Sequence, residues 1–373
     1  MEPQATLRPR PPAVIPAGAL RLGGGQVARP AAAGLGWRDG QARAVRYLRL
    51  SVVDRCNLRC RYCMPAEGVP FVPKADLLSF EELARLTRVF VRFGVRSVRL
   101  TGGEPLVRRD LPALVARLAA IPGLEDLALS TNATHLAPLA RPLRAAGLHR
   151  VNVSLDSLDA ATFADITRSD TLPRVLAGLD AAADAGLGPI KLNVVVLRGR
   201  NDHELPDLVR FAASRGFVLR FIESMPIGVD DFWSPESHVP IDAMLATLRR
   251  DFDVTEPGAA PSDVGLAGGG PARYALCTPR GAPLGTPPVR VGFIAALSQN
   301  FCSTCNRVRV TATGVLQECL AFPGQLSLRD LMRSGADDDA LADAIGAALA
   351  TKGPGHGFAE GQFTYQSMSV TGG

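Results

Sequence analysis

The stretch that decides the fold reads Leu48-Arg-Leu-Ser-Val-Val-Asp-Arg-Cys-Asn-Leu-Arg-Cys-Arg-Tyr-Cys63, an apolar strand pattern followed at once by three cysteines. Cys56, Cys60 and Cys63 fall within eight residues, where the strand is expected to end. A cubane 4Fe-4S cluster normally takes four thiolates, so a loop with three of them leaves one iron open to a small chelating ligand. Structural zinc completed by a distant fourth ligand is the alternative.

Outward from this stretch, β-type runs alternate with segments of helical pattern. Ser79 and Glu82 form the pattern of a helix capping box, and Gly94 follows as a stop signal. Alternation of strand and helix predicts an α/β fold with a parallel sheet, here an incomplete (βα)6 TIM-like barrel that binds ligands at the carboxyl ends of its strands. The strand candidates are Tyr47–Val53, Val95–Leu100, Leu124–Ser130, Arg150–Ser154, Lys191–Leu197 and Val218–Ile222.

Polar residues occupy the expected carboxyl ends of these strands. Thr101-Gly-Gly-Glu-Pro105 follows the second strand, where glycines let a ligand approach the backbone and the carboxylate can accept from an ammonium group. Ser130-Thr-Asn132 and Ser154-Leu-Asp156 end the third and fourth strands, and the segment 220–225 begins in the sixth. Each motif alone is also typical of a turn or a helix cap, but their collective placement favours a ligand site.

A second group of cysteines stands far downstream, as Cys302-Ser-Thr-Cys305 and then Cys319. Three thiolates again suit a cluster with one open iron. The alternative is a Cys3His zinc ribbon with His356 as the fourth ligand. Cys277 remains as a buried or incidental thiol.

Arg307 and Arg309 stand beside these downstream cysteines at alternate positions. In a strand, alternate side chains point to one face, and two guanidiniums on one face suit a polyphosphate. An exposed pair on a solvated strand is the other interpretation.

Composition excludes several classes of protein. The 373 residues are 47% hydrophobic and 21% charged, which is ordinary for a globular chain. The net charge of +5 is scattered and aromatic residues are only 6%, so we expect no nucleic acid partner. No apolar run is long enough to span a bilayer and the start lacks a signal-peptide pattern, so we expect a cytoplasmic protein without a membrane partner. Seven cysteines in such a chain indicate metal or redox chemistry.

Three regions are expected along the chain. Residues 1–40 are rich in Pro, Gly and Ala and predict a disordered extension, and residues 41–225 hold the barrel. Residues 226–373 form a C-terminal region with the second cysteine group, an amphipathic stretch between 233 and 253, and strand signals at Tyr274–Cys277 and Val289–Ile294.

These motifs resemble one known family. The C-x3-C-x2-C spacing with Tyr62 before the last cysteine resembles the signature of the radical S-adenosylmethionine superfamily, and the Gly-Gly-Glu-Pro unit resembles its methionine-binding element. Phe301–Arg309 is similar to the C-terminal cluster motif of GTP 3′,8-cyclases. The likeness runs from Tyr47 to the terminal Gly372-Gly373, with departures at Val53, Ser130 and Ala133, and Ala133 occupies a turn that favours glycine if it needs a positive φ.

The resemblance implies two 4Fe-4S clusters, S-adenosyl-L-methionine as cofactor, and conversion of GTP to (8S)-3′,8-cyclo-7,8-dihydroguanosine 5′-triphosphate, the first step of molybdenum cofactor biosynthesis. It also implies an external one-electron donor of flavodoxin or ferredoxin type, a downstream cyclic pyranopterin monophosphate synthase, and a homodimer. A peptide-modifying radical enzyme and a zinc-ribbon binding protein are the rival functions.

The resemblance also assigns site residues. Cys56, Cys60 and Cys63 would hold the first cluster, and Cys302, Cys305 and Cys319 the second. The residues implied for the S-adenosylmethionine site are Tyr62, Gly103, Ser154, Arg220 and Met225. Those implied for GTP are Arg49, Arg99, Ser130, Lys191, Arg307, Val308 and Arg309. A catalytic role is implied for Arg49, Arg307, Arg309, Gly372 and Gly373.

Overall fold

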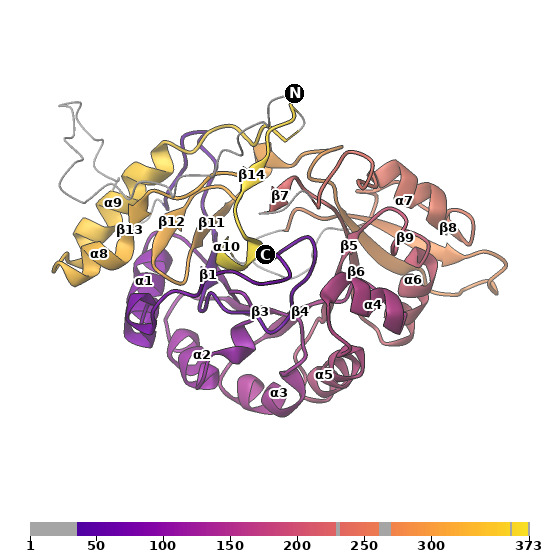
Figure 1. Cartoon of the computed structure of the whole chain (residues 1–373), viewed down its shortest axis with the longest axis horizontal. Helices are drawn as coiled ribbons and strands as arrows, with labels where there is room; N and C mark the ends of the chain where they lie inside the picture. The colour runs from indigo at the N-terminus through magenta and orange to yellow at the C-terminus, as the bar shows by residue number, and fades with distance from the viewer. Residues whose placement is uncertain (1–35, 229–231, 261–269, 359, 372–373) are drawn as a thin grey trace, which may run out of the picture.

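A computed structural model describes residues 36–228, 232–260, 270–358 and 360–371. Its main feature is a curved, open sheet of twelve strands in the order β13-β12-β11-β1-β2-β3-β4-β5-β6-β10-β9-β8 (Figure 1). The strands are β1 (Tyr47–Ser51), β2 (Ser97–Thr101), β3 (Asp126–Thr131), β4 (Arg150–Ser154), β5 (Lys191–Val196), β6 (Val218–Glu223), β8 (Phe252–Val254), β9 (Arg273–Pro279), β10 (Val289–Ile294), β11 (Arg307–Val310), β12 (Val315–Gln317) and β13 (Leu326–Ser327). A separate pair joins β7 (Ile227–Gly228) to β14 (Thr364–Tyr365).

The six strands expected from the sequence are all present as β1 to β6, with ends within two residues of the expected ones. They pair in chain order and in parallel, so the prediction of an incomplete TIM-like barrel is confirmed. Because every connection is a parallel crossover, the carboxyl ends of these strands meet at one rim of the barrel.

The C-terminal region extends the same sheet at both edges. Strand β11 pairs in parallel with β1, and β10 pairs in parallel with β6. The two late strand signals become β9 and β10, which pair antiparallel. The second cysteine group therefore lies next to the first strand of the barrel, although more than two hundred residues separate them in sequence.

Helices cover the outer side of the curved sheet (Figure 1). The predicted capping box is confirmed, because the Ser79 hydroxyl accepts from Glu82 N and the Glu82 carboxylate accepts from Ser79 N. No helix in the described ranges is long and apolar enough to cross a membrane. The helices are α1 (Phe80–Arg92), α2 (Leu111–Ala119), α3 (Leu136–Ala145), α4 (Ala160–Thr167), α5 (Leu172–Asp184), α6 (Leu205–Ser214), α7 (Ile241–Leu248), α8 (Leu328–Arg333), α9 (Asp338–Ala350) and α10 (Met368–Thr371), with 3-10 turns at Lys74–Asp76, Pro105–Val107 and Cys302–Thr304.

The expected disordered extension covered residues 1–40. Residues 1–35 lie outside the described residues, whereas residues 36–40 are ordered, which differs from the prediction. Trp37 is 5% exposed and stacks on Phe93 with ring centroids 4.6 Å apart. Burial of this large aromatic side chain offsets part of the entropy lost when these residues are ordered against α1.

Candidate functional site

The first cysteine loop leaves the carboxyl end of β1 and lies against the end of β3. Cys56, Cys60 and Cys63 are half-buried, and Cys63 N donates to Cys60 O at 2.9 Å. The Asn132 side chain donates to Asn57 Oδ1 at 2.9 Å and faces Cys56 Sγ at 3.9 Å. The motif at the end of the third strand therefore positions the first cysteine.

The turn after β2 packs directly on this loop. A Cβ at Gly103 would lie 2.3 Å from Arg55 O, so only glycine fits at this close approach. Glu104 accepts from Asn132 N at 2.6 Å, Leu106 N at 3.0 Å and the Thr131 hydroxyl at 2.7 Å. Burial raises the pKa of Glu104 to about 7, against the effect of these hydrogen bonds. The Gly-Gly-Glu-Pro unit thus joins the ends of β2 and β3 to the loop.

The turn at the end of β3 does need a positive φ at Ala133. Ala133 has φ 61°, a left-handed value that costs a non-glycine residue free energy. Its N–H donates to the Thr131 hydroxyl at 2.9 Å, and Ala133 is fully buried. These surroundings hold the strained turn in place.

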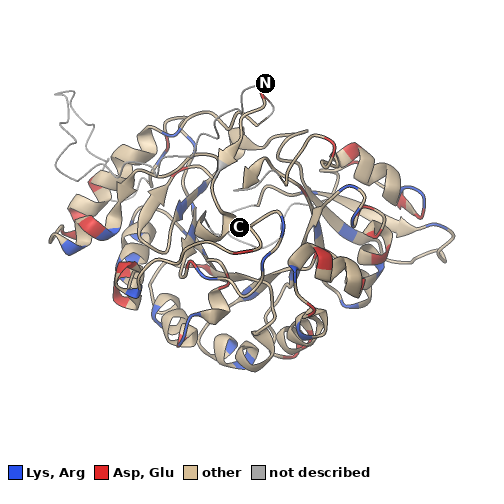
Figure 2. Ribbon diagram, in the orientation of Figure 1, with Lys and Arg blue, Asp and Glu red and all other residues tan. Residues whose placement is uncertain are grey.

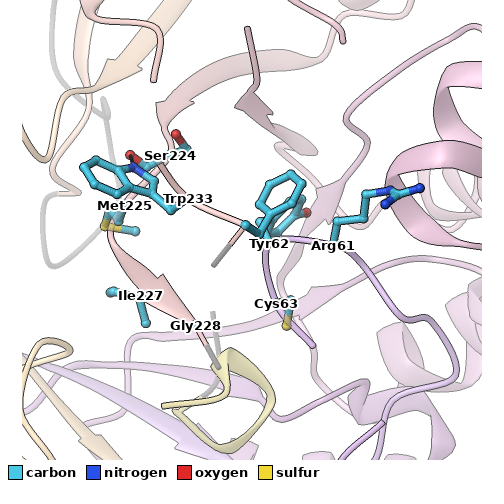
Figure 3. Close-up of a pocket in the computed structure, with 9 residues that line it drawn as sticks. Arg61, Tyr62, Cys63, Ser224, Met225, Ile227, Gly228 and Trp233 are labelled. Carbon is cyan, nitrogen blue, oxygen red and sulfur yellow. Dashed lines mark hydrogen bonds between the residues drawn. The ribbon is translucent and has the colours of Figure 1, made fainter. Parts of the chain in front are cut away.

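A pocket opens between the first cysteine loop and the segment after β6 (Figure 3). Tyr62 and Met225, both assigned to the S-adenosylmethionine site, line it together. The Tyr62 hydroxyl donates to Asp156 Oδ2 at 2.7 Å, and burial raises the pKa of Asp156 to about 6. The lining residues are Arg61, Tyr62, Cys63, Ser224, Met225, Ile227, Gly228, Phe232 and Trp233.

The other residues assigned to this cofactor do not line that pocket. Ser154 is exposed at the carboxyl end of β4. Arg220 is buried on β6 and donates from Nε to the Tyr274 hydroxyl at 2.8 Å. Trp233, which donates from its indole to Ser224 O at 3.2 Å, was not singled out from the sequence, because only the fold brings the segment after β7 to the cysteine loop.

Basic side chains form a row across three neighbouring strands. Arg309 on β11, Arg49 on β1 and Arg99 on β2 are register partners. In parallel strands, register partners point to the same face, so the three guanidiniums lie side by side. Figure 2 shows Lys and Arg in blue on the inner strands as well as on the outer helices.

The electrostatics of this row are unfavourable in the protein alone. Burial, and then the charge of neighbouring arginines, lowers the pKa of Arg49 to about 9 and of Arg309 to about 10. Burial and the charge of Arg49 together lower the pKa of Arg99 to about 9, with burial the larger cause. Within the described residues, the Nε atoms of Arg49 and Arg99 are buried without a hydrogen-bond partner. A polyanion would supply both the missing acceptors and the opposite charge.

The remaining residues assigned to the nucleotide fall into two groups. Ser130 and Lys191 are both register partners of Asn152, so the three share one row further round the barrel. Asn152 Nδ2 is also buried without a hydrogen-bond partner among the described residues. Asn152 lies two positions before Ser154 in the same strand, and this spacing could have identified it as a candidate site residue. Val308 differs, because its side chain packs in the hydrophobic core away from Arg307 and Arg309, so only its backbone can face a nucleotide.

The second cysteine loop has cationic neighbours. Burial opposes ionisation of Cys305, but the charges of Arg307 and Lys352 outweigh it and lower the pKa of this thiol to about 7. Lys352 Nζ lies 3.7 Å from Cys305 Sγ. Arg307 also lies over the Phe301 ring at 4.9 Å.

The histidine of the zinc interpretation packs on an aromatic ring. His356 stacks on Phe358 with centroids 4.3 Å apart. Within the described parts of the chain, no three or more His, Cys, Asp and Glu side chains form a group that could hold a metal ion, and this applies to zinc and to an iron-sulfur cluster alike. Cys277 is fully buried in β9, as expected for a structural thiol.

The donor sets fit iron-sulfur clusters in their chemistry. Each loop presents three half-buried cysteines, and the thiols of each set influence one another electrostatically. Burial raises the pKa of Cys56 to about 11 and of Cys63 to about 12. Thiols of this kind ionise when a soft metal centre supplies the positive charge.

The C-terminal segment connects the two loops. Gln317 on β12 donates to Gln366 Oε1 at 3.1 Å, near the second loop. The Ser367 hydroxyl then donates to Cys63 O at 3.3 Å, in the first loop. Gly372 and Gly373 lie outside the described residues.

Two family descriptions match the chain in sequence. Residues 50–212 match the radical SAM superfamily and residues 217–358 match Molybdenum Cofactor Synthesis C. GTP 3′,8-cyclase 1 of Pseudomonas aeruginosa is 46% identical over 340 residues, which is 90% of this chain and 99% of that protein. GTP 3′,8-cyclase of Mesorhizobium japonicum is 44% identical over 343 residues, with the same coverage of both chains.

Solved structures agree on the fold. SuiB of Streptococcus suis bound to S-adenosylmethionine superposes with a TM-score of 0.50 at 14% identity, over 82% of this chain and 68% of SuiB. At that identity the likeness shows the barrel architecture alone.

Proposed function

The chain belongs to the GTP 3′,8-cyclase family of radical S-adenosylmethionine enzymes, and we infer on this premise that it converts GTP to (8S)-3′,8-cyclo-7,8-dihydroguanosine 5′-triphosphate. This reaction is the first step of molybdenum cofactor biosynthesis. The identity to named relatives extends over nearly their whole length, so both cysteine loops and the basic row fall within the matched region.

The observation that carries this proposal is the basic row of Arg309, Arg49 and Arg99 between the two cysteine loops. Three neighbouring guanidiniums with lowered pKa values repel one another, and a triphosphate offsets that repulsion with paired hydrogen bonds. A peptide substrate carries no comparable charge, so the row favours a nucleotide over a peptide.

Two iron-sulfur clusters fit the six cysteines. Cys56, Cys60 and Cys63 would hold the first, and the second would be held by Cys302, Cys305 and Cys319. When bound, the cofactors supply the electron and the adenosyl radical that start the reaction at C3′ of the ribose.

The protein's own residues bind and orient. Tyr62 and Met225 line the pocket for S-adenosylmethionine beside the first loop. The basic row holds the triphosphate, and Ser130 and Lys191 extend the nucleotide contacts toward β5. Fixing both reactants inside one barrel converts a bimolecular encounter into an oriented one and keeps water from the reacting atoms. Gly372 and Gly373, which lack side chains, would approach the nucleotide closely.

The remaining partners follow from this reaction. The chain would receive one electron at a time from a flavodoxin or ferredoxin type donor, and a cyclic pyranopterin monophosphate synthase would consume the product. We also propose a homodimer in the cytoplasm.

Anaerobic reconstitution with dithionite, S-adenosylmethionine and GTP tests the proposal. Mass spectrometry should detect both 5′-deoxyadenosine and the cyclised nucleotide, with ATP in place of GTP as the matched control. Release of 5′-deoxyadenosine without a cyclised nucleotide would overturn the substrate assignment. Bound zinc without labile sulfide would overturn the radical chemistry itself.

A further inference from the structure

A short N-terminal segment, residues 37–43, contacts the second cysteine loop. Arg43 donates from Nη1 to Cys302 O at 2.6 Å and to Pro354 O at 3.0 Å, and from Nη2 to Gly353 O at 2.8 Å. One guanidinium therefore ties the cysteine loop to the segment that follows α9.

The Asp39 carboxylate contacts both Arg43 and Lys352. Its Oδ2 accepts from Arg43 Nε at 2.8 Å and lies 3.6 Å from Lys352 Nζ. The Asp39 side chain is 0% exposed and that of Lys352 is 4% exposed. Burial of a carboxylate costs desolvation free energy. Here the charges of Arg43 and Lys352 and the hydrogen bond from Arg43 offset that cost.

The Lys352 ammonium lies next to the Cys305 thiol. Its Nζ lies 3.7 Å from Cys305 Sγ and donates to Arg307 O at 2.8 Å. The same ammonium therefore contacts a thiol of the second loop and the first residue of the strand that bears Arg309.

Close packing fixes the segment in this position. A Cβ at Gly40 would lie 2.3 Å from Ala350 O, and Gly40 N donates to Leu349 O at 3.1 Å. Trp37 anchors the other end against Phe93. Residues 37–43 are thus packed between α1 and the end of α9.

We propose that Lys352, held by Asp39, is a positioning residue that places a fixed positive charge against Cys305 and so raises the reduction potential of the second cluster. The proposal rests on the proposed function only for the presence of that cluster. A buried cation next to a thiolate ligand stabilises the more negative, reduced state, whereas the Asp39 carboxylate moderates this effect.

The test compares two variants with opposite expected signs. Lys352→Met removes the cation and should lower the midpoint potential, with at least about a tenfold fall in the reduced-to-oxidised ratio at fixed potential, or about 59 mV for one electron. Asp39→Asn keeps the acceptor oxygen for the backbone but removes the negative charge, and should raise the potential. Arg85→Met removes an ion pair with Asp338 that also joins distant segments, and should leave the potential unchanged.

The measurement is an EPR-monitored redox titration of the full chain, carrying Ala at positions 56, 60 and 63 so that only the second cluster contributes. Opposite shifts in the two variants support the proposal. Shifts in the same direction, or potentials equal to that of the parent chain, overturn it, because a purely structural contact has no reason to change sign. If Lys352→Met fails to load iron, Asp39→Asn decides alone: a raised potential supports the proposal, and any other result overturns it.

This outcome is separable from that of the proposed function. The titration needs neither GTP nor a product, so it decides the role of Lys352 even if no cyclised nucleotide forms. Failure of the cyclisation assay with a normal potential shift would reject the substrate and keep the positioning residue.

Discussion

The two cysteine loops differ in how they are built and in the charge that surrounds them. The first is continuous in sequence and lies near Asn132, the carboxylates Glu104 and Asp156, and the cation Arg59. The second is bordered by the cations Arg307 and Lys352. Burial raises the pKa of the Cys56 thiol to about 11, whereas at Cys305 the two cations outweigh burial and lower the pKa to about 7.

This difference supports the proposed division of labour. A cationic S-adenosylmethionine sulfonium is compatible with the buried carboxylates beside the first loop, and an anionic nucleotide is compatible with the basic surroundings of the second. The basic row of Arg309, Arg49 and Arg99 lies on strands β11, β1 and β2, which connect the two loops. In position it is shared by both loops, but its positive charge matches the basic surroundings of the second loop.

The largest expected effect comes from removing one cysteine from each loop. Cys60→Ala should abolish release of 5′-deoxyadenosine and cyclisation together, each by more than about 100-fold, since loss of a ligand exceeds the cost of losing its supporting contacts. Cys305→Ala should abolish cyclisation to a similar extent but retain most 5′-deoxyadenosine release. Both products are measured by mass spectrometry in one reaction. Equal loss of both products in the two variants would break the division of labour.

An intermediate effect is expected in the basic row. Arg309→Met should reduce kcat/KM for GTP by about 10- to 100-fold, because one charge-assisted hydrogen bond contributes about 1.5–3 kcal/mol. Arg309→Lys keeps the charge without the paired donors and should fall between this variant and the parent. KM for S-adenosylmethionine should stay within about threefold, measured by steady-state kinetics with each substrate varied. An equal rise in the KM for GTP and in the KM for S-adenosylmethionine would indicate that Arg309 supports the fold and does not bind GTP specifically.

The smallest effect concerns a carboxylate that ties the barrel to the second loop. Glu223, at the end of β6, accepts from Leu297 N at 2.9 Å and from the Ser298 backbone at 3.1 Å, four residues before the loop begins. Burial alone would raise its pKa, but the nearby His238, with Nε2 3.7 Å from Glu223 Oε2, and the hydrogen bonds from Ser298 and Leu297 outweigh burial and lower the pKa to about 2 from 4.5.

Because the folded pKa lies below the ordinary one, this carboxylate stabilises the fold fully above about pH 4.5, and the stabilisation is lost as pH falls toward 2. Glu223→Gln should therefore lower the free energy of unfolding by about 1–3 kcal/mol at pH 7. Denaturant unfolding of the apoprotein at several pH values checks this. A difference between variant and parent that persists undiminished near pH 2 would contradict the sign.

The sequence identified most of the barrel and both sets of cysteines. Periodicity located β1 to β6 because each strand is a continuous apolar run followed by a polar end, and the Ser79 capping box is a local pattern. It missed the order of 36–40, because Trp37 packs against Phe90 and Phe93, about fifty residues away, and lies near Gly346 of α9. The strand alternation that placed Arg307 and Arg309 on one face already implied that the Val308 side chain faces the opposite way, into the core.

Residue chemistry and spacing alone thus determined the strand and helix alternation, and they predicted the two groups of three cysteines as metal ligands and the polyphosphate pair at Arg307 and Arg309, since these patterns lie within one strand or loop. Only the tertiary structure decided that β11 pairs with β1, which sets Arg309 beside Arg49, and that Asp39 and Lys352 meet at Cys305. These are pairings between segments far apart in the chain. Their partners are selected by the packing of the whole sheet, a property that no local pattern encodes.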